Sequence, residues 1–220
     1  MENRSTFINQ AARTLLVEDL GLLEYEEAHL YQLQCVEKAD DRLLFVEHPE
    51  VYTFGRKFKE NPPNHLNSII VERGGEATFH NPGQIVFYPI LHLRSEERDL
   101  HLILRKLEEV VITTLAHFTV EACRKEGATG VWVDRGEKKI ASIGIAVKGW
   151  VTYHGVALNY NNSLEGYGAI QPCGFSSGVM TRLTDILGDR CPSREQIKER
   201  LLQHFTSLFQ RNIIERAMIQ

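Results

Sequence analysis

The sequence lacks both a long apolar run and an excess of basic residues. No uncharged stretch approaches the ~20 residues that a helix needs to cross a bilayer. The polar start, residues 1–10, has no apolar core flanked by basic residues, the pattern of a secretory signal. The 25 Lys and Arg face 29 Asp and Glu, a net charge of −4, whereas nucleic-acid binders usually carry a basic excess. We therefore expect a cytoplasmic protein without a membrane or nucleic-acid partner.

Cysteine is scarce, and the common phosphate-binding motif is absent. The four cysteines, at positions 35, 123, 173 and 191, show no spacing typical of a zinc knuckle or a thioredoxin-like pair. The pattern GxxxxGKS/T does not occur, which excludes a P-loop nucleotide site. We therefore expect reduced thiols, no bound metal and no cofactor.

Length and composition are those of an ordinary globular chain. Of the 220 residues, 43% are apolar and 25% are charged, which excludes a disordered or fibrous protein. No internal repeat, low-complexity stretch or long linker divides the chain. We therefore expect a single domain over residues 1–220, acting as a monomer.

Apolar periodicity predicts strands alternating with helices. A spacing of three to four residues predicts helices over about 21–36, 100–118 and 194–210, the last preceded by a capping box of Ser193 and Gln196. Short apolar runs predict strands at 42–46, 69–71, 84–91, 130–133, 140–147 and 151–159. Pro89 must then lie at a strand end or a bulge. This order predicts an α+β fold, a mixed and mostly antiparallel sheet with packed helices.

Residues 73–84, RGGEATFHNPGQ, concentrate glycine with proline and asparagine. Such a backbone can pass close to a ligand and offer amide donors to a carbonyl or an anion. A plain loop between two strands has the same composition. The segment alone therefore leaves a ligand-binding role and an ordinary loop both open.

Cys173 stands between Pro172 and Gly174, which places the thiol on a constrained turn rather than in a regular element. A nucleophilic cysteine needs a nearby base or a cation that stabilises the thiolate. Candidates are His48, His80, His154 and the Lys138–Lys139 pair, of which Lys139 directly precedes the predicted strand at 140–147. Lone cysteines are most often inert core residues, so both interpretations stay open, while Cys35 and Cys123 are expected in the core or at its edge.

Four motifs then match one family in order and spacing. They are Arg73 to Gln84, KIASIG at 139–144, HGVALN at 154–159 and PCG at 172–174, with Cys173 standing 34 positions after Lys139. Together they resemble the octanoyl-(acyl-carrier-protein):protein N-octanoyltransferases of lipoate biosynthesis, over about residues 48–187. One departure is Asn81, where the family usually has glycine; asparagine tolerates a positive φ better than most residues.

The resemblance implies the fold of the biotin and lipoate protein ligases. It also implies transfer of an octanoyl group from octanoyl-acyl carrier protein to a lysine of lipoyl domains, those of 2-oxoacid dehydrogenase E2 subunits and the glycine cleavage H protein. In that family the cysteine matching Cys173 forms an acyl-enzyme, and the lysine matching Lys139 is its acid/base partner. Substrate binding is expected at residues of the matching motifs, namely Arg73, Gly74, Gly75, Thr78, His80, Gly83, Ser142, Ile143, Gly144, His154, Gly155 and Ala157.

The chemistry agrees with these roles. Exchange between two thioesters is nearly balanced in energy, and attack by an amine then gives an amide, so no ATP step is required. Lys139 as a cation would stabilise the thiolate, and as a neutral amine it would accept the proton of the incoming lysine. Tyr88, Ile143 and Val156 are candidates to line an apolar tunnel for the acyl chain.

Three other functions remain open. An ATP-dependent lipoate or biotin protein ligase would share the fold but bind an adenylate. A cysteine hydrolase would pair Cys173 with His154 and release free octanoate. A non-catalytic module would only dock acyl carrier protein. Because that carrier is acidic, we expect a basic docking patch, formed by Arg56, Lys57 and Lys59 or by Lys148 and Arg182.

Overall fold

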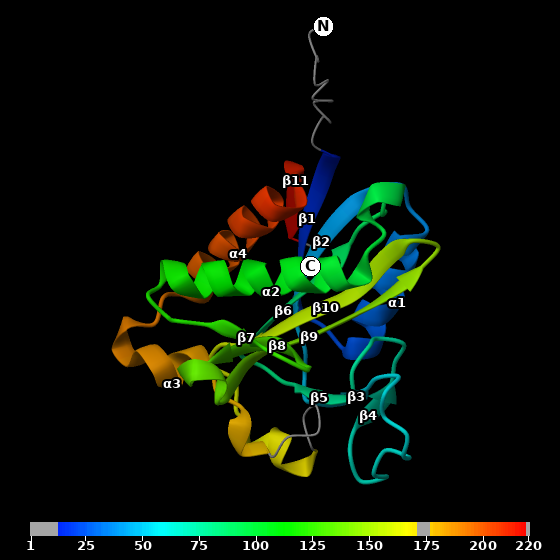
Figure 1. Ribbon diagram of the computed structural model, residues 1–220. Helices are drawn as coiled ribbons and strands as arrows, with labels where there is room; N and C mark the ends of the chain where they lie inside the picture. The colour runs from blue at the N-terminus through cyan, green and yellow to red at the C-terminus, as the bar shows by residue number, and fades with distance from the viewer. Residues whose placement is uncertain (1–12, 171–176, 219–220) are drawn as a thin grey trace, which may run out of the picture.

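The computed structural model describes residues 13–170 and 177–218, and its centre is an eight-stranded mixed sheet (Figure 1). The strand order is β11-β1-β2-β6-β10-β9-β8-β7. Strands β11, β1 and β2 run parallel, and all other neighbours pair antiparallel. In chain order the strands are β1 (Arg13–Leu22), β2 (Asp41–Glu47), β6 (Gln84–Ile90), β7 (Cys123–Lys125), β8 (Ala128–Val133), β9 (Lys138–Lys148), β10 (Val151–Asn159) and β11 (Arg211–Met218).

Helices cover both faces of this sheet. Figure 1 shows α2 (Leu100–His117) and α4 (Arg194–Phe209) together in front of it, with α1 (Tyr25–Val36) on the other side. In β2, Leu43 and Phe45 join the core under α2 and α4, while Leu44 joins the core under α1. This alternation explains why the central strands are continuous apolar runs, since both of their faces are buried.

A second, three-stranded sheet, β4-β3-β5, lies beside the end of the main one, at the lower right of Figure 1. Helix α3 (Leu183–Leu187) lies at the lower left of the same view. It consists of β3 (Val51–Phe54), β4 (Ser68–Ile70) and β5 (Ala77–His80). β5 lies inside the glycine-rich segment, so part of that segment is a fully buried strand rather than the loop expected from its composition. The hydrogen bonds from β3 hold it there, as Val51 pairs with His80.

The α+β class and the mixed, mostly antiparallel sheet are confirmed. The central helix, predicted over 100–118, runs from Leu100 to His117, and the last helix has its predicted capping box at Ser193. Pro89 lies at the end of β6, beyond the last pair that β6 makes with β10, so no ladder bond to β10 needs its missing N–H. Within the described residues, no helix combines the length and the apolar character of a transmembrane span.

The predicted start of the first helix is wrong. The helix begins at Tyr25 rather than at 21, because Gly21 and Leu22 complete β1, and Leu22 pairs with Glu47 of β2. Leu22 fits the helical spacing, yet its side chain is 62% exposed at the strand end. Sequence spacing alone could not distinguish an apolar strand end from the first turn of the helix.

Candidate active site

A small cavity lies against β6, β9 and β10, at the end of the main sheet next to β5. Its walls come from α1, from residues 73–80 and from the middle of the three strands. The lining residues are Tyr25, Arg73, Gly75, Glu76, Ala77, Thr78, His80, Val86, Tyr88, Ser142, Ile143, Gly144, His154, Gly155, Val156 and Ala157. Segments far apart in the sequence therefore form one site.

Most residues predicted from the motifs meet in this cavity. Ten of the twelve predicted substrate-binding residues line it; the exceptions are Gly74 and Gly83. The tunnel candidates Tyr88, Ile143 and Val156 line it as well. Tyr25 was missed, because its place in the periodic pattern of the first helix reads as an ordinary core position.

Lys139 is buried at the start of β9, with 0% of its surface exposed. Its ammonium nitrogen lies 5.6 Å from the ring centroid of Trp132 on β8, a cation–π distance. Gly130 makes room for it, since a Cβ there would lie 2.6 Å from Cε of Lys139 and 2.5 Å from the carbonyl oxygen of Ala141. Lys138, the preceding residue, is exposed instead. Strand alternation thus separates two adjacent lysines into one buried and one solvated cation.

Cys173 lies outside the described residues. The segment that follows it, from Ser177 onward, is hydrogen-bonded to Lys138 and Lys139. Lys138 Nζ donates to the carbonyl of Gly178 at 2.7 Å, and the N–H of Thr181 donates to the carbonyl of Lys139 at 2.9 Å. Met180 also forms an isolated bridge with Lys139.

The three described cysteines lie away from the cavity. Cys35 is buried in the core, and burial raises the pKa of its thiol above the ordinary value. Burial also raises the pKa of Cys191. Neither thiol is activated, and neither they nor Cys123 line the cavity. The expected core or edge positions of Cys35 and Cys123 are confirmed.

His80 is held neutral by burial and fixed by Gln84. Burial lowers the pKa of His80 to about 3. The Gln84 amide nitrogen donates to Asn159 Oδ1 at 2.9 Å, so its oxygen faces His80 Nδ1 at 2.8 Å and must accept. His80 therefore carries its proton on Nδ1, and its Nε2 lone pair faces the Thr53 hydroxyl at 3.5 Å.

Arg73 supplies a fixed positive charge to the cavity wall. Its guanidinium donates to the carbonyl and the hydroxyl of Thr53, at 2.6 and 2.9 Å. Only 8% of the residue is exposed. This charge helps to keep His80 and His154 neutral, because it opposes a second positive charge nearby.

Asn81 and Gly83 shape the turn between β5 and β6. Asn81 does not adopt a positive φ; its side chain instead donates to the carbonyl of Ser163 at 3.0 Å and accepts from Asn162 at 3.0 Å. Gly83 has φ +93°, and a Cβ there would lie 2.8 Å from the backbone nitrogen of Asn162. The asparagine thus anchors the neighbouring loop, and the left-handed position of this turn is filled by Gly83.

A chain of hydrogen bonds runs through the wall behind the cavity. His48 donates from Nδ1 to the carbonyl of Leu23 at 2.7 Å, so its Nε2 accepts from the Tyr88 hydroxyl at 2.8 Å. Burial lowers the pKa of His48 to about 4, which keeps this ring neutral. The Tyr25 hydroxyl, which lines the same cavity, lies 3.2 Å from His154 Nδ1.

The fold is that of the lipoate and biotin protein ligases. A putative lipoate protein ligase of Thermoplasma acidophilum with bound lipoic acid superposes with a TM-score of 0.71, at 16% identity over 95% of this chain and 90% of that one. A biotin protein ligase of Aquifex aeolicus superposes with a TM-score of 0.53, at 13% identity over 89% of this chain and 69% of that one. The predicted fold relationship is confirmed.

Sequence comparison identifies the family within this fold. The model of the lipoyl protein ligase A/B catalytic domain matches residues 23–206. An octanoyltransferase of Syntrophotalea carbinolica is 45% identical, over 87% of this chain and 93% of that protein. A chloroplastic octanoyltransferase of Arabidopsis thaliana is 42% identical, over 79% of this chain and 67% of that protein. The chain belongs to the octanoyltransferases of lipoate biosynthesis, which are acyltransferases.

We predict a pH dependence of stability that depends on His48. An unfolded histidine takes up a proton near its ordinary pKa of 6.5, whereas folded His48 resists protonation down to about 4. The free energy of unfolding must therefore fall as the pH drops below about 6.5, by about 2 kcal/mol for this residue between pH 7.5 and pH 5. Between pH 7.5 and pH 5, the free energy of unfolding of His48→Gln, measured by urea denaturation, should fall by about 2 kcal/mol less than that of the wild type.

The control is His101→Ala, which removes an exposed histidine on α2 and should keep the wild-type pH dependence. An unchanged pH dependence in His48→Gln would show that His48 is not held neutral in the folded protein.

Proposed function

We propose that the protein transfers an octanoyl group from octanoyl-acyl carrier protein to a lysine of lipoyl domains, through a thioester on Cys173 with Lys139 as the acid/base group. The acceptors are the lipoyl domains of 2-oxoacid dehydrogenase E2 subunits and the glycine cleavage H protein. The observation that carries the proposal is the cavity, because residues from distant motifs line one pocket with an apolar wall of Tyr88, Ile143 and Val156.

In the first half-reaction, the Cys173 thiolate attacks the thioester carbonyl of the donor. A new S–C bond forms, the S–C bond to the phosphopantetheine arm breaks, and the arm leaves as a thiol once it has taken up a proton. Lys139 as a cation stabilises the attacking thiolate and supplies that proton. Backbone N–H groups near the thioester would stabilise the tetrahedral oxyanion, each worth about 3–4 kcal/mol when well placed.

In the second half-reaction, the amine of the acceptor lysine attacks the acyl-enzyme. The new N–C bond replaces the S–C bond to Cys173, and the amine proton passes to Lys139, which the first step left neutral. The two proton transfers cancel, so the enzyme returns to its starting state. No oxidant, metal or nucleotide enters this balance.

Two features support Lys139 rather than its neighbours as the acid/base group. Its side chain is fully buried, so it is held in one place, whereas Lys138 is solvated. The backbone of Lys139 pairs with the segment that follows Cys173 in the chain. A cysteine hydrolase would use His154 as its base. The two ring nitrogens of His154 instead face Tyr25 and Glu72.

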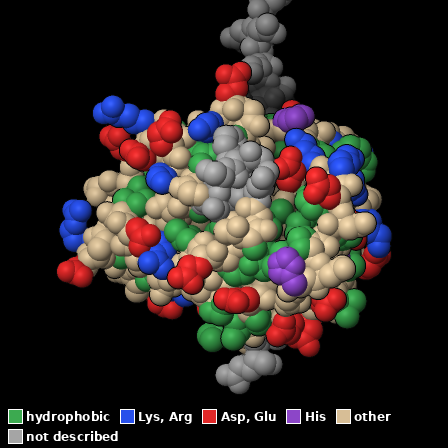
Figure 2. Space-filling view, turned by 90° about the horizontal axis from the view of Figure 1, so that it is seen from below, with side chains coloured by type: hydrophobic (Ala, Val, Ile, Leu, Met, Phe, Trp, Pro, Cys, Tyr) green, Lys and Arg blue, Asp and Glu red, His purple; other side chains and the backbone are tan. Residues whose placement is uncertain are grey.

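The docking patch for the acidic carrier protein is assigned to Arg56, Lys57 and Lys59. All three are exposed, and no carboxylate of the described chain lies within ion-pairing distance of them. The other candidates are neutralised, since Lys148 pairs with Glu37 and Arg182 with Asp185, both at 2.8 Å. Figure 2 shows acidic and basic side chains interspersed over the face seen from below, so docking relies on a local patch.

The ATP-dependent ligase remains the second candidate, because solved structures of the same fold include a lipoate-protein ligase A bound with ATP. That structure is 15% identical to this chain, whereas octanoyltransferases reach 45%. The similarity to the ligase therefore supports only the shared fold. A requirement for ATP in the reaction would distinguish the ligase from the octanoyltransferase.

The thioester predicts a mass change. Incubation with octanoyl-acyl carrier protein without ATP should add one octanoyl group to the wild-type protein, measured by intact-protein mass spectrometry. Cys173→Ala should show no addition, because it lacks the nucleophile. Cys191→Ala, which removes a half-buried thiol outside the cavity, should be acylated like the wild type.

Acylation that persists in Cys173→Ala would contradict the assigned nucleophile. A strict requirement for ATP would favour the ligase instead.

The lysine assignment predicts a contrast between two adjacent residues. Lys139→Ala should lower the rate of transfer to a lipoyl domain by at least about 10²-fold, the typical effect of losing an acid/base group. Lys138→Ala should keep most of the wild-type rate, because among the described residues its exposed ammonium donates only to the carbonyl of Gly178. A small exogenous amine should restore part of the activity of Lys139→Ala, which a purely structural role would not allow. Equal rates in both variants would show that Lys139 takes no part in proton transfer.

A further inference from the structure

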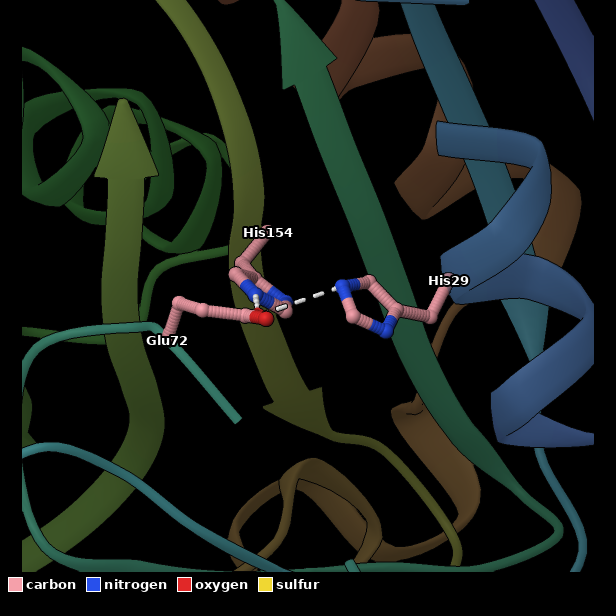
Figure 3. Close-up of side chains that lie close together, drawn as sticks. All are labelled: His29, Glu72 and His154. Atoms are coloured by element: carbon pink, nitrogen blue, oxygen red, sulfur yellow. Dashed lines mark ion pairs between the residues drawn. The ribbon is translucent and has the colours of Figure 1, made fainter. Parts of the chain in front are cut away.

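Three potential metal ligands from distant segments meet beside the cavity, as Figure 3 shows. They are His29 on α1, Glu72 in the connection between β4 and β5, and His154 on β10. Nε2 of His29 lies 3.3 Å from Oε2 of Glu72, and Nε2 of His154 lies 3.6 Å from the same oxygen. All three ligand atoms lie within 4.8 Å of one another.

The Nε2 atom of His154 is buried and has no hydrogen-bond partner among the described residues, and the residue is only 1% exposed. Its Nδ1 lies 3.2 Å from the Tyr25 hydroxyl, and its Nε2 faces Glu72. When Nδ1 donates its proton to Tyr25, the lone pair on Nε2 is presented to Glu72 and to a cation bound beside it.

The backbone holds His154 in this orientation at a cost. Its φ is +57°, a left-handed conformation that few residues other than glycine adopt. Its N–H donates to Oε1 of Gln32 at 2.7 Å, from the same helix that carries His29. A strained, buried histidine with an unused lone pair is typical of a functional site rather than of a packed core.

The two distances to Glu72 fit a tetrahedral ion. With metal–ligand bonds of about 2.0–2.1 Å, the ligand atoms of a tetrahedral site lie about 3.3–3.4 Å apart. The two contacts to Glu72, 3.3 and 3.6 Å, are close to this value. Two imidazole nitrogens and one carboxylate oxygen suit Zn²⁺ or Co²⁺ better than Ca²⁺ or Mg²⁺, which prefer oxygen ligands alone.

The surroundings complete the pattern of a metal site. The Tyr25 hydroxyl lies 3.2 Å from His154 Nδ1, in position to accept the proton of a metal-bound imidazole, as outer-shell partners commonly do. The side chain of Glu72 is 47% exposed, so the site opens to solvent where an ion can enter and a water can fill the fourth position.

We propose that His29, Glu72 and His154 bind one divalent cation of the Zn²⁺ or Co²⁺ class, which clamps α1 and the β4–β5 connection onto β10. No sequence spacing indicates this site, because its ligands come from three separate elements. The clamp lies outside the acyl-transfer chemistry. It holds the cavity wall, since His154 lines the cavity and Glu72 directly precedes Arg73.

The test is a titration of the metal-free protein with Co²⁺, followed by visible absorption and isothermal calorimetry. One Co²⁺ should bind per chain with a tetrahedral spectrum and without a thiolate charge-transfer band. His29→Ala and Glu72→Gln, neither of which lines the cavity, should each weaken binding at least about 100-fold, since even outer-shell changes cost 10–100-fold. His101→Ala is the matched control and should bind like the wild type.

Thermal unfolding gives a second readout that is independent of activity. Co²⁺ or Zn²⁺ should raise the melting temperature of the wild type and of His101→Ala, and leave His29→Ala unchanged, because only the folded site binds the ion. Wild-type crystals soaked in Zn²⁺ should show an anomalous peak between His29 and His154, which decides the matter even if a variant folds poorly. Equal binding by all variants, or an ion held by a cysteine, would overturn the proposal.

Discussion

The proposed acyl transfer depends on burying a lysine side chain inside a sheet. Lys139 is the second residue of β9, and its alkyl chain and ammonium occupy the space that Gly130 leaves open on β8, against the ring of Trp132. Removing an ammonium from water is costly unless the surroundings compensate, so such a residue is rarely accidental. The register of β8 and β9 therefore determines which of two consecutive lysines enters the protein and which one stays in water.

The cavity itself, whose lining does not include Lys139, is organised by neutral, hydrogen-bonded histidines. Burial lowers the pKa of His48, His80 and His154 far enough that none of them carries a charge at neutral pH. Arg73 then supplies the fixed positive charge in the cavity wall. This arrangement suits the proposed acyl transfer, in which the pocket accepts an apolar chain next to a polar thioester, because charge is confined to a few fixed groups.

Much of this could be predicted from the sequence. The α+β class, the central helix and the hairpin that carries Lys139 followed from periodicity, and most of the cavity lining followed from the family resemblance. Elements that depend on long-range pairing could not be predicted. The edge strand β11 is largely polar and exposed, and its residues Arg211 and Asn212 pair with Arg13 and Thr14, which are about two hundred positions earlier.

The same limit applies to the site. In the sequence, Gly130 cannot be distinguished from an ordinary strand residue, because its contact with Lys139 is seen only in the fold. Tyr25 likewise cannot be distinguished from an ordinary core residue. The grouping of His29, Glu72 and His154 depends on a helix, a loop and a strand that meet only in the folded chain. Residue type and spacing identified the chemistry of each motif, and packing determined which side chains meet.

The most direct test of the account is a crystal structure of the octanoylated protein, prepared without an acceptor domain. The account predicts a thioester on Cys173 next to the ammonium nitrogen of Lys139, with the acyl chain along Tyr88, Ile143 and Val156. A thioester far from Lys139, or an acyl chain bound outside this cavity, would contradict it.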